Sequence, residues 1–172
     1  PGTGDLWVAN GGNNPSIISI LRDGASTLGA PTYSNSGAST FTTTAELAIA
    51  ESLAFDTAGN LWVTSRNLGQ IRKYPLSAGN ISQSTSQFIT ALSTPGALAF
   101  DTTGNMYVGE TNEMTPFTGK LWKFPNLGTA GSPVISNTPV LLQNGVDPTA
   151  LAFIAGQLWG TSDLNDQVVQ LA

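Results

Sequence analysis

Short runs of apolar residues alternate along the chain with clusters of glycine, asparagine, proline and serine. Runs of a few apolar or β-branched residues predict strands, and the clusters between them are typical of turns. One stretch is written twice in nearly the same letters, as LAFDTAGNLWVTS at 53–65 and LAFDTTGNMYVGE at 98–110. The pattern therefore predicts a repeated unit built from strands.

An aromatic anchor recurs in four places, and each anchor is followed by a second apolar run. The anchors are Leu6-Trp7-Val8, Leu61-Trp62-Val63, Met106-Tyr107-Val108 and Leu158-Trp159-Gly160. Three of them are preceded by the letters LAF, and further apolar stretches stand before each LAF. Each complete unit thus predicts four strands, which in the second unit are LAFD, LWVTS, IRKYPL and SQFIT.

Tandem four-stranded units of roughly 40–55 residues are typical of β-propeller blades. We predict an all-β fold, a β-propeller of four-stranded antiparallel blades, with about three and a half blades in this chain. The chain is expected to form a single propeller domain, or part of one, over 1–172. Its units lie at approximately 1–44, 45–90, 91–143 and 144–172. The four anchor aromatics are expected to be largely buried between successive blades.

The turn between the first two strands has a clear chemistry in the second and third units. Asp56 and Asp101 can accept backbone N–H groups of the turn, and Gly59 and Gly104 can take the positive φ that closes the hairpin. These aspartates are interpreted as structural. The fourth unit reads FIAGQL, one residue shorter and without aspartate, so it predicts a tighter turn.

The first unit lacks its inner strand and the fourth lacks its outer strand, which gives units of three, four, four and three strands. Three interpretations remain open: a part of a larger propeller, a ring completed by further copies, or a self-closed ring of four blades. Missing blades from the parent chain or from another copy are thus the expected partners, besides an unidentified protein or small polar ligand.

The segments LAFDTAGNLWVTSRNLGQIRKYPL and GDLWVANGGNNPSIISI resemble NHL-repeat β-propellers, and the resemblance extends over nearly the whole chain. The chain is similar also to regucalcin-like and gluconolactonase-like six-bladed propellers. Such folds include scaffolds, ligand binders, lactonases and lyases, so the resemblance implies a fold more than a function. The lyases depend on histidine, and this chain has none.

Candidate site residues follow from propeller geometry, because the end of each second strand and the start of each first strand approach the central channel from the same side. Regucalcin-like propellers hold a divalent metal there, usually calcium, which hard oxygen ligands suit. The metal candidates are Glu51, Glu110, Asn10 and Asp163. Further candidates at the channel mouth are Ser65, Arg66, Thr149 and Ser162. The alternative is that these are ordinary solvated loop residues.

Composition narrows the function classes. The net charge is −5 with only six Lys and Arg, so a nucleic-acid surface is not expected. The chain has no long apolar run and no cysteine or histidine, which excludes a membrane-spanning helix, thiol nucleophiles and the Ser-His-Asp triad. We expect a secreted or periplasmic, non-enzymatic binding or assembly module without a cofactor. The alternative is a divalent-metal-dependent lactonase or hydrolase, with calcium as its metal.

Overall fold

A computed structural model of the chain describes ten segments, within which the strands below are assigned. The described residues are 6–10, 17–21, 39–42, 47, 49–77, 80–81, 87–112, 118–125, 138–162 and 166–171. Within these segments the regular structure consists of strands, as the apolar pattern predicts, and no helix is long and apolar enough to cross a membrane.

Four antiparallel sheets follow one another along the chain. The first sheet holds β1 (Leu6–Asn10), β2 (Ile17–Leu21) and β3 (Ser39–Thr42). The second holds β4 (Ala50–Phe55), β5 (Leu61–Ser65), β6 (Gln70–Tyr74) and β9 (Gln87–Ile89). The third holds β10 (Pro95–Phe100), β11 (Met106–Glu110), β12 (Lys120–Phe124) and β13 (Val140–Asn144). The fourth holds β14 (Pro148–Ile154), β15 (Gln157–Ser162) and β16 (Gln167–Gln170), and a small ribbon pairs β7 (Leu76–Ser77) with β8 (Asn80–Ile81).

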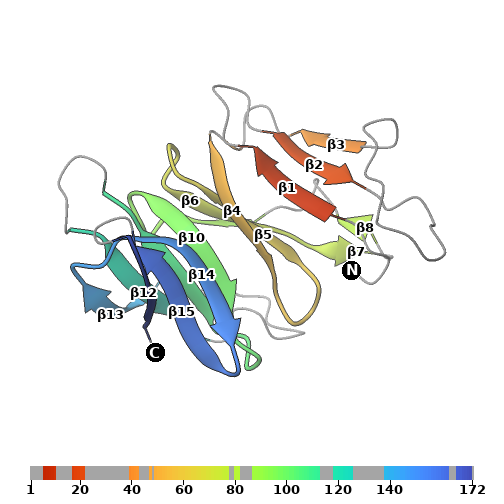
Figure 1. The fold of residues 1–172 in the computed structure, drawn as a ribbon. Coiled ribbons are helices and arrows are strands. Elements are labelled where there is room, and N and C mark those ends of the chain that lie inside the picture. Colours follow the sequence, from red (N-terminus) through yellow and green to blue (C-terminus); the bar gives the residue numbers. More distant parts are fainter. Residues whose placement is uncertain are drawn as a thin grey trace.

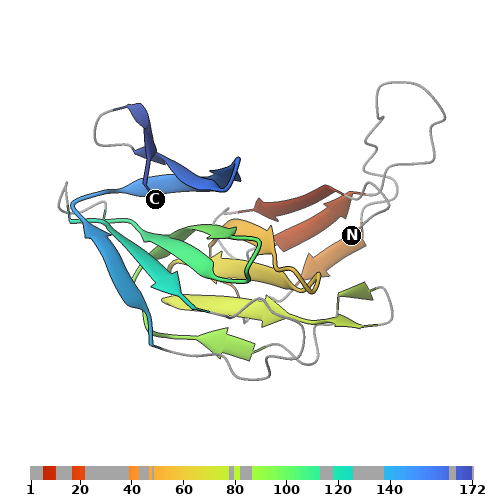
Figure 2. The same cartoon turned by 90° about the horizontal axis from the view of Figure 1, so that it is seen from below.

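The four sheets fan out in chain order, and the innermost described strands of neighbouring sheets lie side by side (Figures 1 and 2). Strand β1 lies beside β4, β4 beside β10 and β10 beside β14. The predicted series of three, four, four and three strands is therefore confirmed for the described residues. Strands β1 and β16 belong to different sheets. The involvement of further blades stays a prediction.

The turns that join the first and second strands of the second and third sheets have the predicted hydrogen bonds to aspartate. Asp56 Oδ1 accepts the N–H groups of Ala58 at 3.0 Å and Asn60 at 2.9 Å, and Gly59 has φ 81°. The turn at Asp101 is built in the same way. In the fourth sheet Ala155 and Gly156 both have positive φ, 51° and 80°, which makes the tighter two-residue turn.

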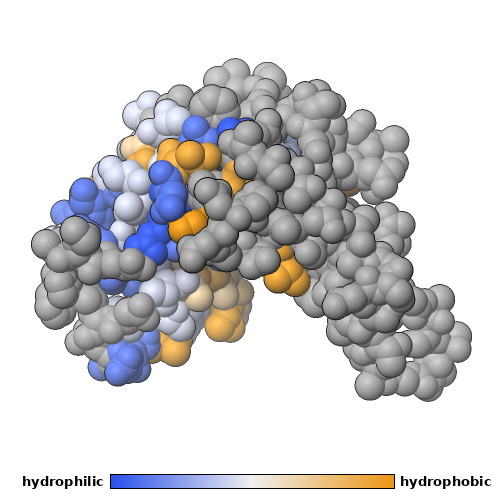
Figure 3. Space-filling model, turned by 90° about the horizontal axis from the view of Figure 1, so that it is seen from above, coloured by the Kyte–Doolittle hydropathy of each residue, from blue (hydrophilic) through white to orange (hydrophobic). Residues whose placement is uncertain are grey.

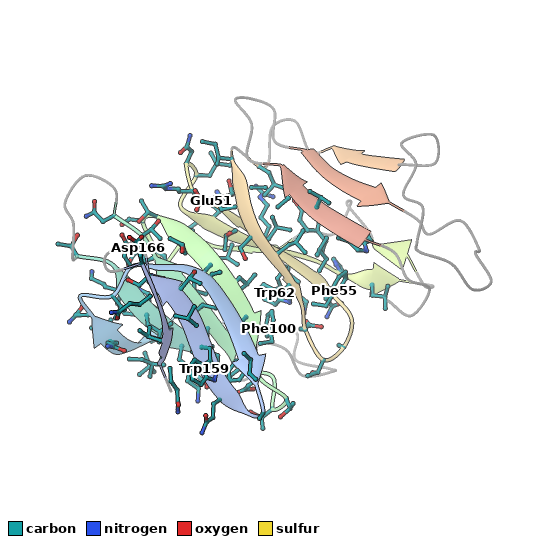
Figure 4. All side chains as sticks on the ribbon, viewed as in Figure 1. Glu51, Phe55, Trp62, Phe100, Trp159 and Asp166 are labelled. Atoms are coloured by element: carbon teal, nitrogen blue, oxygen red, sulfur yellow. The ribbon has the colours of Figure 1, made fainter. Side chains whose placement is uncertain are left out.

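The core lies between the sheets and repeats one aromatic contact. The anchor aromatic of each of the first three sheets packs against the phenylalanine of the LAF sequence in the next sheet, which lies at or next to the end of the inner strand. Ring centroids are 5.9 Å apart in Trp7–Phe55, 5.7 Å in Trp62–Phe100 and 5.2 Å in Tyr107–Phe153. Figure 4 shows Trp62 and Phe100 between the second and third sheets. The shared position of these aromatics is thus confirmed.

Burial of the anchors differs along the fan. Trp62 is fully buried and Tyr107 is 8% exposed, whereas Trp7 and Trp159 are half-buried. The predicted burial of the four anchors is therefore complete or nearly so in the second and third sheets, and it is weaker for Trp7 and Trp159. The physical reason for Trp159 is that no described sheet follows the fourth one.

Candidate ligand pocket at the channel mouth

The inner strands β4, β10 and β14 share one irregularity near their first residue. The pairing register with the second strand shifts between Ala50 and Leu53, between Pro95 and Leu98, and between Pro148 and Ala150. A β-bulge of this kind frees residues from the ladder and re-aims their side chains. Within the three shifts lie Glu51, Gly96 and Thr149, of which Glu51 and Thr149 were candidates from the sequence.

These bulges surround a pocket of about 410 Å³ to which all four sheets contribute. The floor and rim include small or apolar residues, namely Ala9, Ile49, Ala50, Gly96 and Ala97. The polar lining consists of Glu51, Arg66, Thr111, Asp147 and Thr149. Small residues near the axis leave room that larger side chains would fill, so the pocket results from residue size as well as from the bulges.

Glu51 and Arg66 form an ion pair on one wall of this pocket. Glu51 Oε1 accepts a hydrogen bond from Arg66 Nη1 at 2.9 Å, and the side chains are 26% and 18% exposed. The other carboxylate oxygen of Glu51 is turned toward Gly96, where an added Cβ would lie 3.3 Å from it. Glu51 is labelled at the mouth end of β4 in Figure 4. One oxygen of the carboxylate is therefore engaged and the other borders the open space.

Two lining residues were missed by the sequence reasoning. Thr111 is 7% exposed, and its Oγ1 has no hydrogen-bond partner among the described residues. Asp147 is 8% exposed, and its Oδ1 accepts the N–H of Asn112 at 3.3 Å. Thr111 follows the second strand one position beyond Glu110, and Asp147 precedes β14 by one position. A search one residue beyond Glu110 and two residues before Thr149 would have found both.

Backbone strain is present at the same place. Ile49 lines the pocket and has φ 56°, a left-handed conformation that β-branched residues rarely adopt. Its carbonyl accepts the N–H of Arg66 at 3.2 Å, which ties the strained residue to the ion-paired arginine. Strained residues are held in place by surrounding structure and concentrate at ligand sites. Ile49 is thus a strained residue in the lining of this pocket.

Glu110 does not line this pocket, and both of its carboxylate oxygens accept hydrogen bonds. Its Oε1 accepts the N–H groups of Ser93 at 2.8 Å and Thr94 at 3.4 Å, and its Oε2 accepts Trp122 Nε1–H at 2.9 Å. It lines a separate pocket of about 210 Å³ together with Lys120. The structure therefore does not bring Glu110 and Glu51 together in one pocket.

The remaining sequence candidates divide between the described and the undescribed parts of the chain. Arg66 and Thr149 line the larger pocket, Ser65 is fully buried and Ser162 is half-buried outside its lining. The side chain of Asn10 and the whole of Asp163 lie outside the described residues. Among the residues that the structure describes, no group of three or more acidic, histidine or cysteine side chains could hold a metal ion.

The sheets and their common channel mouth define a partial all-β propeller. No known family model and no curated protein matches the chain. Solved structures do: the chain is similar to virginiamycin B lyase from Staphylococcus aureus, with 14% identity, a TM-score of 0.64, and 99% of this chain and 49% of that one covered.

A calcium-binding protein, regucalcin from Agrobacterium tumefaciens, matches at 14% identity and a TM-score of 0.61, with coverage of 95% and 52%. The catalytically inactive lyase from Staphylococcus aureus, in which a histidine is replaced by alanine, matches at 13% identity and a TM-score of 0.57. The match covers 98% of this chain and 55% of that one. The chain thus spans about half the length of the propellers that it matches. At such identities the similarity establishes the fold alone.

Proposed function

We propose that this chain is a non-enzymatic binding module that takes a small polar ligand at the channel mouth. The observation that carries the proposal is the pocket of about 410 Å³ with contributions from all four sheets. Its volume falls within the range of about 300–1,000 Å³ that ligand pockets occupy. Because several blades meet there, a ligand in this pocket would contact residues far apart in the sequence.

The lining chemistry suggests a ligand that donates hydrogen bonds, such as a polyol or an amine. The lining contains two carboxylates, Glu51 and Asp147, and one guanidinium, that of Arg66, so its formal charge is negative. Thr111 adds a buried hydroxyl without a partner among the described residues. Burying an unpaired hydroxyl costs about 1–3 kcal/mol, and a ligand that this hydroxyl turns to meet by rotation about χ1 would remove that cost.

Absent side-chain types support a binding role over catalysis. The sequence contains no histidine or cysteine, so neither nucleophilic triads nor histidine acid–base chemistry is available. The matched lyase loses its activity when a histidine is replaced by alanine. Chemistry of that kind does not transfer to this chain.

The test is a binding titration of the intact chain by calorimetry, with myo-inositol and ethanolamine as probes. We expect saturable binding of at least one probe. Thr111→Val should weaken it about tenfold, because one buried hydrogen bond is lost. The same substitution should leave the unfolding free energy equal or higher, since it removes an unpartnered buried hydroxyl.

Thr102→Val is the matched control, because Thr102 is exposed in the hairpin at the opposite end of β10. It should bind the probes as the wild type does. Absence of saturable binding for both probes, or equal binding by the Thr111→Val variant, would contradict the proposal.

A calcium-dependent hydrolase of the lactonase type is the second candidate. The observation in its favour is that the carboxylates of Glu51 and Asp147 line one pocket, and the matched regucalcin is a calcium-binding protein. Oxygen ligands of this kind suit calcium. Calcium titration of the wild type and the Glu51→Gln variant, followed by a gluconolactone hydrolysis assay, separates the two candidates. Calcium-dependent turnover that is lost in the variant would favour the enzyme.

We further propose an extracytoplasmic location, secreted or periplasmic. The support is compositional: there is no cysteine, few lysines, and many hydroxyl and amide side chains. Fractionation of cells that express the natural gene product with an epitope tag tests this proposal. Recovery in the cytosolic fraction would contradict it.

A further inference from the structure

The face of the fourth sheet that points away from the third sheet is apolar and open. Ile154 is 58% exposed and Val168 is 67% exposed, and Trp159 beside them is half-buried. A shallow apolar pocket of about 140 Å³ lies on this face, lined also by Ala152 and Thr161. Hydrophobic residues reach the surface in the described part of the molecule, as Figure 3 shows from one side. We call these five residues the Trp159 face.

Three interfaces inside the molecule show what such a face contacts. In each of them the anchor aromatic of one sheet meets the phenylalanine at or next to the end of the next inner strand, with ring centroids 5.2–5.9 Å apart. Trp159 occupies the anchor position, because it pairs with Ala152 as Trp62 pairs with Ala54 and Tyr107 with Ala99. The Trp159 face therefore repeats surfaces that are covered elsewhere in this chain.

We propose that the Trp159 face is the docking surface for one further blade of the same repeat. That blade is expected to place the phenylalanine at the end of its inner strand against the Trp159 ring. The proposal continues an interface that the molecule already builds three times in succession. It also agrees with the length of the matched propellers, of which this chain covers 49% and 52%.

A second copy of this chain is a poorer occupant. The phenylalanines at or next to the end of described inner strands are Phe55, Phe100 and Phe153, and each already contacts an anchor aromatic of its own chain. A second copy that continued the series of sheets would present its first sheet to the Trp159 face. That sheet has no inner strand among its described strands. A copy thus offers no free phenylalanine from the described residues at the required position.

The test extends the whole chain with a copy of its own third unit, residues 91–143, joined after residue 172. Tryptophans are labelled with fluorine, and the Trp159 signal in the ¹⁹F NMR spectrum is assigned by its loss in Trp159→Phe. We expect the added unit to shift this signal and to reduce its broadening by a soluble paramagnetic probe at least twofold. The matched control carries F100A in the added copy only, and it should leave Trp159 as accessible as in the unextended chain.

A second variant keeps the test informative if the added unit folds poorly. Val168→Lys places a charge on the open face, so in the unextended chain it should change Tm by less than about 2 °C. In the extended chain it should lower Tm by at least twice as much, because it charges a covered interface. Equal effects in both chains, or equal Trp159 protection with and without the phenylalanine, would overturn the proposal.

Sedimentation of the unextended chain tests the other occupant directly. We expect a monomer at concentrations where the ¹⁹F signal of Trp159 is broadened by the probe. A dimer whose formation protects Trp159 would show that a second copy covers the face, and it would overturn the assignment to a further blade.

Discussion

Trp62 and Trp159 stand at the same place in two sheets and have different surroundings. Both follow a leucine on the second strand, and both pair with the alanine of an LAF sequence. Trp62 is fully buried between two sheets, and its Nε1–H donates to Asp56 Oδ2 at 2.8 Å. Trp159 is half-buried on the last described sheet, in a unit whose shorter turn has no aspartate.

The difference shows that an anchor aromatic owes its environment to two neighbours rather than to its own strand. One neighbour is the phenylalanine of the next sheet, as in the contact of Trp62 with Phe100. The other is the aspartate of its own turn, which also fixes the hairpin by accepting N–H groups of the turn. Where both are missing, the same ladder leaves the side chain only half-buried. Substitutions around Trp62 are therefore expected to lower the free energy of unfolding more than the same substitutions around Trp159.

The largest effect is expected from truncating the two tryptophans. Trp62→Ala should lower the unfolding free energy by about 3–5 kcal/mol, because it opens a cavity in a closed interface. Trp159→Ala should cost less, about 1–2 kcal/mol, since that side chain is only half-buried and no closed interface is opened. Urea unfolding of both variants measures the difference. Equal losses would mean that the Trp159 face is as well covered as the interior.

A smaller effect is expected at the turn aspartates. Asp56→Ala removes the acceptor of Trp62 Nε1–H, which stays buried, and should cost about 1–3 kcal/mol. Asp101→Ala should cost less, because Asp101 is only half-buried and Tyr107 Oη–H reaches it at a longer distance of 3.2 Å. Thermal unfolding of the two variants provides the measurement. The reverse order would contradict the role of the buried indole.

The smallest effect is a pH dependence carried by Asp101. Burial by itself raises the pKa of this carboxyl, but hydrogen bonds from Asn105 and Thr103 outweigh it and hold the pKa below its ordinary value of 3.8. A lowered pKa in the folded state stabilises the protein above the ordinary value, and this contribution is lost as the pH falls through the folded-state pKa. The stability difference between wild type and Asp101→Asn should therefore shrink below about pH 4. Urea titrations at pH 6 and pH 2.5 test this, and a constant difference would contradict it.

Much of the fold could be predicted from the sequence, because its determinants are local and repeated. The LAF and anchor runs fix which side chains share a face, and the Asp–Gly turns fix the hairpin register. The shorter turn at Ala155 and Gly156 was also predicted from a single missing residue. The weaker burial of Trp159 could not be predicted, since it depends on a neighbouring sheet rather than on its own letters.

The candidate site was predictable only in part. Glu51, Arg66 and Thr149 were placed at the channel mouth from strand order, and they do line one pocket. Thr111 and Asp147 were missed, because both lie just outside strands β11 and β14, beyond the strand-end positions from which the candidates were taken. The engagement of Glu110 by Trp122 and by backbone N–H groups depends on contacts across a loop, which the repeat pattern does not encode.

The bulges at Glu51, Gly96 and Thr149 have a consequence for how such a molecule can change. Each of these residues lies outside the regular pairing, while the aromatic contacts that join the sheets lie farther along the same strands. Side chains such as Glu51 and Thr149 can therefore be exchanged without removing the aromatic contacts that join the sheets. The repeat thus separates recognition from architecture, so that new ligand preferences can arise, in evolution or by design, on an unchanged frame.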